Sequence, residues 1–251
     1  MEHYPLVLEQ KIKIYSYLVG EDMVLTVPSL LSLIQEISSE HVDMCNIGWR
    51  KLKSSNLYWM LSKLYIKVER MPQWSENVLL RTWNKLHETI TAYRDYEMVD
   101  ENGNKLLVAT SSWIIFDANS GKIKRLNEFD NNLIAPGNKV AIDENAPKIP
   151  KIELIEDCKY NEVLPSDIDV NKHVNNSNYI KWALDTIPNM YKNNFTKLKD
   201  VVVNYLGQAK IGELYGIVSK KIASNKYITS IFSKYNKNEY CRIQSTWEEE
   251  K

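Results

Sequence analysis

Apolar and polar residues alternate in short stretches along most of the chain, which is the pattern of half-buried strands. The first such stretch, residues 6–18, predicts a strand. At Pro28 the spacing changes: apolar residues recur every three or four positions and predict a helix with one buried face. Proline suits the first turn of a helix because the N–H group that it lacks would have no partner there. The predicted buried face consists of Leu30, Leu33, Ile34, Ile37, His41 and Met44.

Alternation returns after this helix and predicts an antiparallel meander. Its strands are expected at residues 57–69, 77–86, 91–99 and 105–117. The pair Asn102-Gly103 indicates a tight hairpin between the last two strands, because it accepts the positive φ angles of a short turn. The first half of the chain is therefore expected to run strand, helix, meander.

A region rich in Pro, Gly, Asn and Asp interrupts the periodicity at residues 127–150. We place a linker at 131–150, between an N-terminal unit (1–130) and a C-terminal unit (151–251). The second unit repeats the order of the first. Its strands are expected near 152–163 and at 198–209, 213–223, 226–235 and 239–248, with a helix between the first two that ends at Ile187, before Pro188. The buried face of that helix is predicted to be Tyr179, Ile180, Ala183, Leu184 and Ile187.

Two local matches indicate an internal repeat. The residues 110–113 (TSSW) match 244–247 (QSTW), and Asp22 can be aligned with Asp167. That alignment sets Val24, Thr26 and Pro28 opposite Asp169, Asn171 and His173. A helix followed by a meander, present twice, predicts two similar units side by side. The expected fold class is α+β, with each antiparallel sheet wrapped around its own long helix and the two sheets joined edge to edge.

Composition narrows the class of protein. The 251 residues suffice for one large or two small domains, and 44% apolar with 25% charged residues is typical of soluble globular proteins. A net charge of zero argues against a nucleic-acid partner. No apolar run approaches the roughly 18 residues of a membrane helix, and the N-terminus lacks the pattern of a secretory signal. Three distant cysteines favour a reducing cytoplasm and show no metal-ligand spacing.

A cluster of polar residues immediately precedes the second helix: Asp167, Asp169, Asn171, His173, Asn175 and Asn176. Asp and Asn at such positions most often cap the helix. We interpret Asp167 as a capping or turn-forming residue, and Asn175 and Asn176 as residues of the helix start. His173 is the side chain here that titrates near neutral pH. Asp169 could orient its neighbours or act as a general base. Backbone N–H groups at the start of the helix could stabilise a developing oxyanion.

These residues carry a resemblance to a known family. The segment SDIDVNKHVNNSNYIKWALDTIP (166–188), the segment NLYWMLSKLYIKVERMPQW (56–74), Arg94-Asp95 and ATSSWIIFD followed by Arg125-Leu126 resemble the acyl-ACP thioesterases over residues 10–248. The resemblance implies two tandem hotdog domains and hydrolysis of fatty acyl thioesters on acyl carrier protein, with no metal or cofactor. Carried over by position, the catalytic groups fall on Asp169, Asn171 and His173.

One position departs from the family pattern. The family's Tyr-x-x-Glu-Cys is represented by Tyr205 followed by Gln208 and Ala209, so that the carboxylate and the cysteine are both replaced. We therefore expect Asp169 to be the base and Gln208 to position the water. The first unit lacks the motif, so one site per chain is expected, with the first unit shaping the acyl pocket. Candidate substrate-binding residues are Leu33, Ile37, His41, Trp59 and Met60, with core packing as the alternative for each.

Other functions remain open at this point. An acyl-CoA thioesterase would use the same chemistry, and the missing carboxylate makes a catalytically weak acyl-thioester-binding protein an alternative; a dehydratase fits the motif less well. A lysine-rich stretch suits an acidic carrier protein, although general lysine richness explains it too. Its lysines are Lys172, Lys181, Lys192, Lys197, Lys199 and Lys210. A monomer and a homodimer are both compatible with the repeat.

Overall fold

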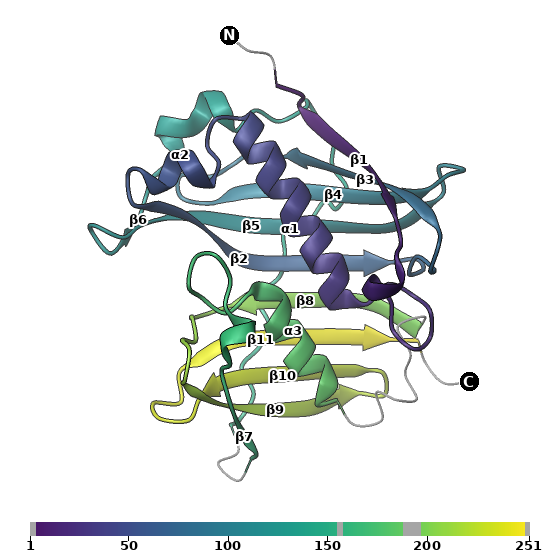
Figure 1. Ribbon diagram of the computed structural model, residues 1–251, viewed down its shortest axis with the longest axis vertical. Coiled ribbons are helices and arrows are strands. Elements are labelled where there is room, and N and C mark those ends of the chain that lie inside the picture. Colours follow the sequence, from purple (N-terminus) through teal and green to yellow (C-terminus); the bar gives the residue numbers. More distant parts are fainter. Residues whose placement is uncertain (1–3, 155–157, 188–196, 249–251) are drawn as a thin grey trace.

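The computed structural model describes residues 4–154, 158–187 and 197–248 (Figure 1). Its strands form a single antiparallel sheet of 11 strands. The strands of the N-terminal half are β1 (Val7–Lys13), β2 (Leu57–Val68), β3 (Asn77–Asn84), β4 (Ala92–Asp100), β5 (Lys105–Asp117) and β6 (Lys122–Ile123). Those of the C-terminal half are β7 (Tyr160–Glu162), β8 (Leu198–Tyr205), β9 (Leu214–Ala223), β10 (Lys226–Ser233) and β11 (Glu239–Trp247). The α-helices of the described residues are α1 (Val27–Met44), α2 (Trp49–Lys53) and α3 (Asn176–Asp185).

The order of strands shows the repeat directly. The sheet runs β1-β3-β4-β5-β2 and continues β8-β11-β10-β9-β7, so each half has the same internal order. The halves join through the antiparallel pair β2–β8, where Tyr65 lies opposite Val202. The long helices α1 and α3 lie on the same face of this continuous sheet and contact each other (Figure 1). The predicted fold, α+β with two tandem hotdog units joined edge to edge, is confirmed.

The two helices bury the faces that their sequences predict, with small differences. The Thr26 hydroxyl caps α1 by accepting a hydrogen bond from the Ser29 N–H at 3.3 Å. On α1, Leu33 is only half-buried, and Met44 at its end is 50% exposed, so the predicted stripe is wrong at its last position. All five residues predicted for the buried face of the second helix are buried. Pro188, the predicted helix stop, lies outside the described residues.

Other differences concern the ends of elements. The strand expected near 152–163 is limited to Tyr160–Glu162 among the described residues, since Ile149 and Ile152 instead pack in a cluster with β8, β9 and β10. The strand expected to run to residue 209 ends at Tyr205, and Gly207 follows it. The short helix α2 and 3-10 turns at Ser16–Leu18, Leu126–Asn132 and Pro165–Asp167 are too short to show a periodicity.

The linker is bound across the outer face of the sheet, opposite the helices. Neighbouring strand residues point to opposite faces, so Arg94 reaches α1 whereas Asp95 Oδ2 accepts a hydrogen bond from the N–H of Ala141 at 2.7 Å. Asn204 of β8 binds the linker twice, accepting from the N–H of Ile149 at 2.9 Å and donating to the carbonyl of Pro147 at 2.9 Å. Buried polar side chains of the sheet thus provide hydrogen-bond partners for backbone groups of the linker, which pair with no strand of the described residues.

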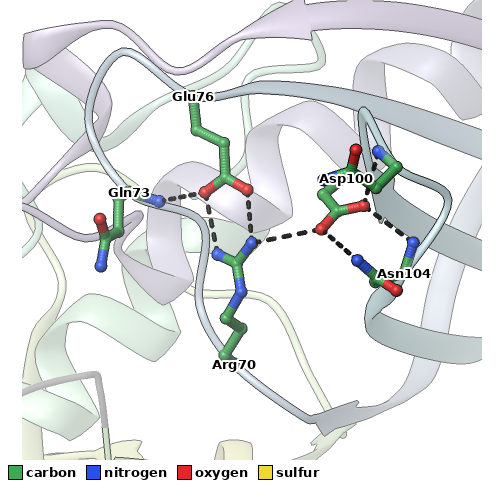
Figure 2. Close-up of polar contacts among 6 residues, drawn as sticks. Arg70, Gln73, Glu76, Asp100 and Asn104 are labelled. Atoms are coloured by element: carbon green, nitrogen blue, oxygen red, sulfur yellow. Dashed lines mark hydrogen bonds and ion pairs between the residues drawn. The ribbon is translucent and has the colours of Figure 1, made fainter.

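The loop after β2 is attached to the hairpin between β4 and β5 (Figure 2). Arg70 donates to both oxygens of Glu76, at 2.9 and 2.6 Å, and its guanidinium lies 3.8 Å from Asp100. Asp100 in turn accepts from the N–H groups of Asn102 and Asn104 at 2.9 and 2.8 Å, which forms the predicted turn, with Gly103 at a φ of 81°. This polar group fixes the end of the N-terminal sheet.

The loops that precede α1 and α3 have the same backbone geometry. In the first, the N–H of Gly20 donates to the carbonyl of Val24 at 3.0 Å; in the second, that of Asp169 donates to His173 at 2.8 Å. A positive φ recurs at the equivalent residues: Met23 at 57° and Lys172 at 63°. The caps Thr26 and Asn175 follow at the same distance along the chain.

This geometry corrects the alignment of the two halves. The residues opposite Asp169, Asn171 and His173 are Gly20, Asp22 and Val24, not Val24, Thr26 and Pro28. The sequence alignment matched one aspartate with another, whereas the structure matches the caps of the two helices. The first loop still lacks both the carboxylate at the Asp169 position and the imidazole at the His173 position.

Candidate active site

A cavity of about 660 Å³ lies between the two halves. Its N-terminal wall comes from the second half of α1, from α2, from the first residues of β2 and β4 and from the last third of β5. Its C-terminal wall is the loop 168–175, the first turn of α3 and the segment after β8. Asp169, Asn171, His173 and Gln208, the four predicted catalytic residues, all line it. The structure therefore brings these four residues together around one cavity.

The loop 169–173 is shaped by the carboxylate of Asp169. Its Oδ1 atom accepts the N–H of Asn171 at 2.8 Å and that of His173 at 3.3 Å. The backbone of Asp169 closes the same loop, because its N–H binds the carbonyl of His173 and its carbonyl accepts from Lys172 at 3.0 Å. Both side-chain bonds use Oδ1. The carboxylate of Asp169 thus fixes the backbone of the loop that carries Asn171 and His173.

The polar residues around this loop also form hydrogen bonds that stabilise the local structure. Asn175 caps α3 by accepting from the N–H of Ser177 at 3.0 Å, as predicted. Asp167 Oδ2 accepts from the N–H of Leu164 at 2.8 Å and so closes the 3-10 turn Pro165–Asp167, which is the turn-forming role among its predicted alternatives. Asn176 is the first residue of α3, as predicted, and its side chain donates to Gln35 of α1 at 3.0 Å. That contact joins the two helices beside the cavity.

The segment after β8 is held against α3 by two tyrosines. The hydroxyl of Tyr205 donates to the carbonyl of Asn176 at 3.2 Å, and the buried hydroxyl of Tyr179 accepts from the N–H of Ala209 at 2.9 Å. Burial raises the pKa of Tyr179, so its phenol stays protonated. Gln208 is carried by this segment and is exposed at the edge of the cavity. The half-buried His173 lines the same cavity.

The predicted substrate-binding residues fall into two groups. Trp59 and Met60 of β2 line the cavity. Leu33, Ile37 and His41 of α1 are not among its lining residues. Ile37 belongs to the core between α1 and the N-terminal sheet, and Leu33 packs against that core. The part of α1 that lines the cavity is instead more polar, with Gln35, Ser38 and Ser39.

His41 belongs to a buried polar network with Arg94. Nη1 of Arg94 lies 2.7 Å from Nδ1 of His41, and His41 Nε2 lies 2.8 Å from the carbonyl of Pro5. Burial and the charge of Arg94 lower the pKa of His41 to about 4. The ring is therefore neutral, so Nδ1 accepts from Arg94 and Nε2–H donates to Pro5. The network explains why the first helix buries a histidine that does not line the cavity.

Arg94 also gives the N-terminal end of the cavity a polar surface. Its Nη2 atom donates to Asn84 at 2.7 Å, and both residues line the cavity. No ion pair joins Arg94 to a carboxylate within the described part of the chain. The Nδ2 atom of the buried Asn84 has no hydrogen-bond partner there. The remaining wall at this end is largely apolar, with Leu52, Trp59, Ala92 and Leu133.

Other chemistry finds no support in the described residues. Burial raises the pKa of the Cys45 thiol to about 11 and raises that of Cys241 as well, so both thiols are protonated and unsuited to nucleophilic attack. Residues 4–154, 158–187 and 197–248 contain no group of three His, Cys, Asp or Glu side chains that could hold a metal ion. None of the helices in those ranges has the length and apolar character to cross a membrane.

Two features of the site are absent from the sequence prediction. Trp49 of α2 donates its indole N–H to Asn171 Oδ1 at 2.6 Å, across 122 positions of the chain. Arg94 and Asn84 line the cavity from β4 and β3. The Arg94-Asp95 pair was visible as part of the family resemblance, but neither periodicity nor spacing links these residues to the motif.

Models of one family match nearly the whole chain. The acyl-ACP thioesterase N-terminal domain matches residues 5–131, and the acyl-ACP thioesterase C-terminal domain matches residues 153–249. Among curated relatives, an oleoyl-acyl carrier protein thioesterase of Arabidopsis thaliana is 25% identical over 94% of this chain and 71% of its own length. A palmitoyl-acyl carrier protein thioesterase of Cuphea hookeriana is 28% identical over 73% of this chain and 47% of its own. The matched part of this chain thus spans about half the length of that relative.

Solved structures share the fold. An acyl-ACP thioesterase from Bacteroides thetaiotaomicron superposes with a TM-score of 0.86 at 21% identity, covering 96% of this chain and 98% of its own. A 12:0-ACP thioesterase from Umbellularia californica gives a TM-score of 0.83 at 19% identity and covers 100% of both chains. At these identities the likeness concerns the arrangement of the sheet and helices.

Proposed function

The chain belongs to the acyl-ACP thioesterase family, and from this premise we propose that it hydrolyses fatty acyl thioesters of acyl carrier protein to free fatty acid and the carrier. The observation that carries the proposal is the cavity between the two halves. It has the polar motif at its C-terminal wall, and its other end is lined by Leu52, Trp59, Ala92 and Leu133 beside Arg94 and Asn84. Such a cavity can hold an acyl chain with its thioester at Asp169, Asn171 and His173.

The chemistry needs a polarised carbonyl, an activated water and a proton for the leaving thiolate. We assign the amide of Asn171 to the carbonyl oxygen as a hydrogen-bond donor. His173 is assigned to the leaving group as the proton donor, since histidine is the side chain that most often serves as a general acid or base. Asp169 Oδ2 is assigned to the water as base, with Gln208 as a second contact to that water. The free N–H groups in the first turn of α3 add to the stabilisation of the oxyanion.

An acyl-length panel tests the function. Acyl-ACP and acyl-CoA thioesters of several lengths are offered to the wild-type chain and to His173→Ala, and release of thiol is measured. We expect turnover of acyl-ACP by the wild type and a fall of about 100-fold or more for the variant, the usual range for loss of a proton donor. Higher kcat/KM on acyl-CoA would favour the alternative carrier. Binding without turnover would indicate an acyl-thioester-binding protein instead, and full activity of His173→Ala would remove the site assignment.

The carrier protein is proposed to approach along the lysine-rich surface beside the site. Lys172, Lys181 and Lys210 are exposed, whereas Lys199 is paired with Glu248 at 2.6 Å and Lys192 lies outside the described residues. Lys181→Glu with Lys210→Glu is expected to lower kcat/KM on acyl-ACP by about tenfold at low salt, because the steering charge is lost. Lys122→Glu on the exposed strand β6 is the control. Equal kcat/KM for both variants would exclude this surface as the docking site.

We also propose that the chain acts in the cytoplasm as a monomer or a homodimer. The location is supported by its three cysteines, which form no disulfide. A monomer is supported by the pair β2–β8, which joins two hotdog units within one chain. Cell fractionation and light scattering test these two points.

A further inference from the structure

The N-terminal half contributes a side chain directly to the motif loop of the C-terminal half. Trp49, the first residue of α2, donates its indole N–H to Oδ1 of Asn171 at 2.6 Å. Both residues line the cavity. The bond joins elements from the two halves of the repeat, although the first half has no motif of its own. A residue of the first half thereby touches one of the predicted catalytic groups.

The chemistry of the two partners determines which way the amide of Asn171 points. A side-chain amide has an acceptor on one side and a donor on the other, and a half-turn exchanges them. An indole N–H can only donate. Its partner must therefore be the oxygen, so Oδ1 faces Trp49 and Nδ2 faces away from it. Asn171 is then left with its two N–H bonds for any further partner.

The position of Trp49 is itself supported by its neighbours. Gly48 precedes it, and a Cβ atom at Gly48 would lie 1.6 Å from Asp43 Oδ1 and 2.8 Å from the Cα of the same residue. Only glycine allows the chain to enter α2 so close to α1. On the other side, Nζ of Lys53 lies 4.0 Å from the centre of the indole ring. This cation–π contact helps to hold the ring in place.

We propose that Trp49 is a positioning residue that holds Asn171 as a hydrogen-bond donor toward the thioester carbonyl. The inference rests on the proposed function, because it assigns Asn171 to the carbonyl. With Trp49 in place, the amide of Asn171 is oriented before substrate binds. A half-turn of this amide, which would present Oδ1 to the substrate, is disfavoured because it breaks the hydrogen bond to the indole N–H. The N-terminal unit then supplies part of the active site as well as the wall of the acyl pocket.

The first test replaces the donor and keeps the ring. Trp49→Phe retains an aromatic surface for Lys53 but has no N–H group. We expect kcat to fall about tenfold while KM stays within about twofold, since the lost bond orients a group that acts on the transition state. Trp74→Phe is the matched control, because Trp74 is 51% exposed and does not line the cavity. An unchanged kcat for Trp49→Phe would overturn the proposal.

The second test asks whether Trp49 acts through Asn171. In an Asn171→Ala background the change Trp49→Phe should have no further effect on the residual rate, whereas two independent roles would multiply. The indole N–H resonance of Trp49, identified by its absence in Trp49→Phe, should move in Asn171→Ala and stay in place in Asp167→Asn. Multiplying rate effects or an unmoved resonance would each refute the proposal. The resonance is read without turnover, so a chain that failed to hydrolyse acyl-ACP would refute the proposed function separately.

Discussion

The carboxylate of Asp169 accepts two backbone hydrogen bonds and is also the proposed base. A single substitution can separate these two roles. Asn at this position keeps an oxygen for the N–H groups of Asn171 and His173, now bound at 2.8 and 3.3 Å, but it cannot accept a proton. If Asp169 is the base, Asp169→Asn should fold normally and lose about 100-fold or more in kcat. Gln208→Ala, assayed in parallel, should lose less, because Gln208 only positions the water.

The control for this comparison is Asp167→Asn, since Asp167 also accepts a backbone N–H, that of Leu164. It should retain wild-type kcat. If Asp169→Asn keeps its activity while Gln208→Ala abolishes it, Gln208 holds the water and Asp169 only shapes the loop.

His41 gives the protein a pH-dependent stability. Its pKa is lowered to about 4 in the folded state, from 6.5. Because the unfolded chain takes up the proton first, stability present at neutral pH is lost as the pH falls from about 6.5 toward 4. His41→Gln can keep both hydrogen bonds without titrating. Between pH 7 and 4.5, urea unfolding should show wild type losing about 2 kcal/mol more than the variant. Parallel losses in the two proteins would contradict this prediction.

Single residues also show the limits of reasoning from sequence. The spacing of Asp169, Asn171 and His173 is local, so the family pattern could locate them and the structure gathers them with Gln208. Trp49 meets Asn171 across 122 positions, and such a contact depends on how two units pack. Leu33, Ile37 and His41 are candidates for the pocket by family resemblance, with core packing as the alternative, but the residues of α1 that line the cavity include Gln35 and Ser39 instead.

At the scale of elements, the linker is ordered by side chains of the sheet. Asn204 is 2% exposed and binds both Ile149 and Pro147. Asn204→Ala leaves those backbone groups without partners, and we expect it to lower the free energy of unfolding by about 1–3 kcal/mol. Proteolysis between residues 133 and 152 should also become faster. Urea unfolding and timed digestion measure the two effects.

A surface contact of the same linker provides the control. Glu144 is bound to Lys67 at 2.8 Å, but the Glu144 side chain is 58% exposed. Glu144→Gln should change the unfolding free energy by no more than about 1 kcal/mol. If it destabilises the protein as much as Asn204→Ala, burial of Asn204 is not what holds the linker.

Periodicity in the sequence predicts the long helices and strands, but it does not predict that the linker packs on the outer face of the sheet. The meander strands and the buried face of α3 follow from local alternation and helical spacing, which the chain carries in each segment. The strand expected near 152–163 failed because Ile149 and Ile152 are apolar for a different reason: they cover the outer face of β8–β10. An apolar residue in a sequence favours burial, but it does not indicate against which element the side chain packs.

The whole molecule depends on the junction of β2 and β8. Without its partner, each half would expose the backbone groups of an edge strand. If the chain is divided after Gly137, at a turn with a φ of 62°, we expect each fragment alone to aggregate. The two fragments expressed together should give a soluble complex. Soluble yield and light scattering measure this, and two soluble, monomeric fragments would show that the halves fold independently.

The isolated β-bridge between Val24 and Gln73 affects how many ligands one chain is expected to bind. In the first half this pairing, together with the bond from Leu25 N–H to the carbonyl of Pro72, joins the loop before α1 to the segment after β2. Within the described residues, the loop 173–175 makes no corresponding bridge to 208–210. Duplication of a binding unit ordinarily doubles the stoichiometry and allows cooperativity between equal sites. Here the loop of one copy is joined in this way and does not line the cavity, so titration with a non-hydrolysable acyl thioether should saturate at one equivalent along a simple hyperbola.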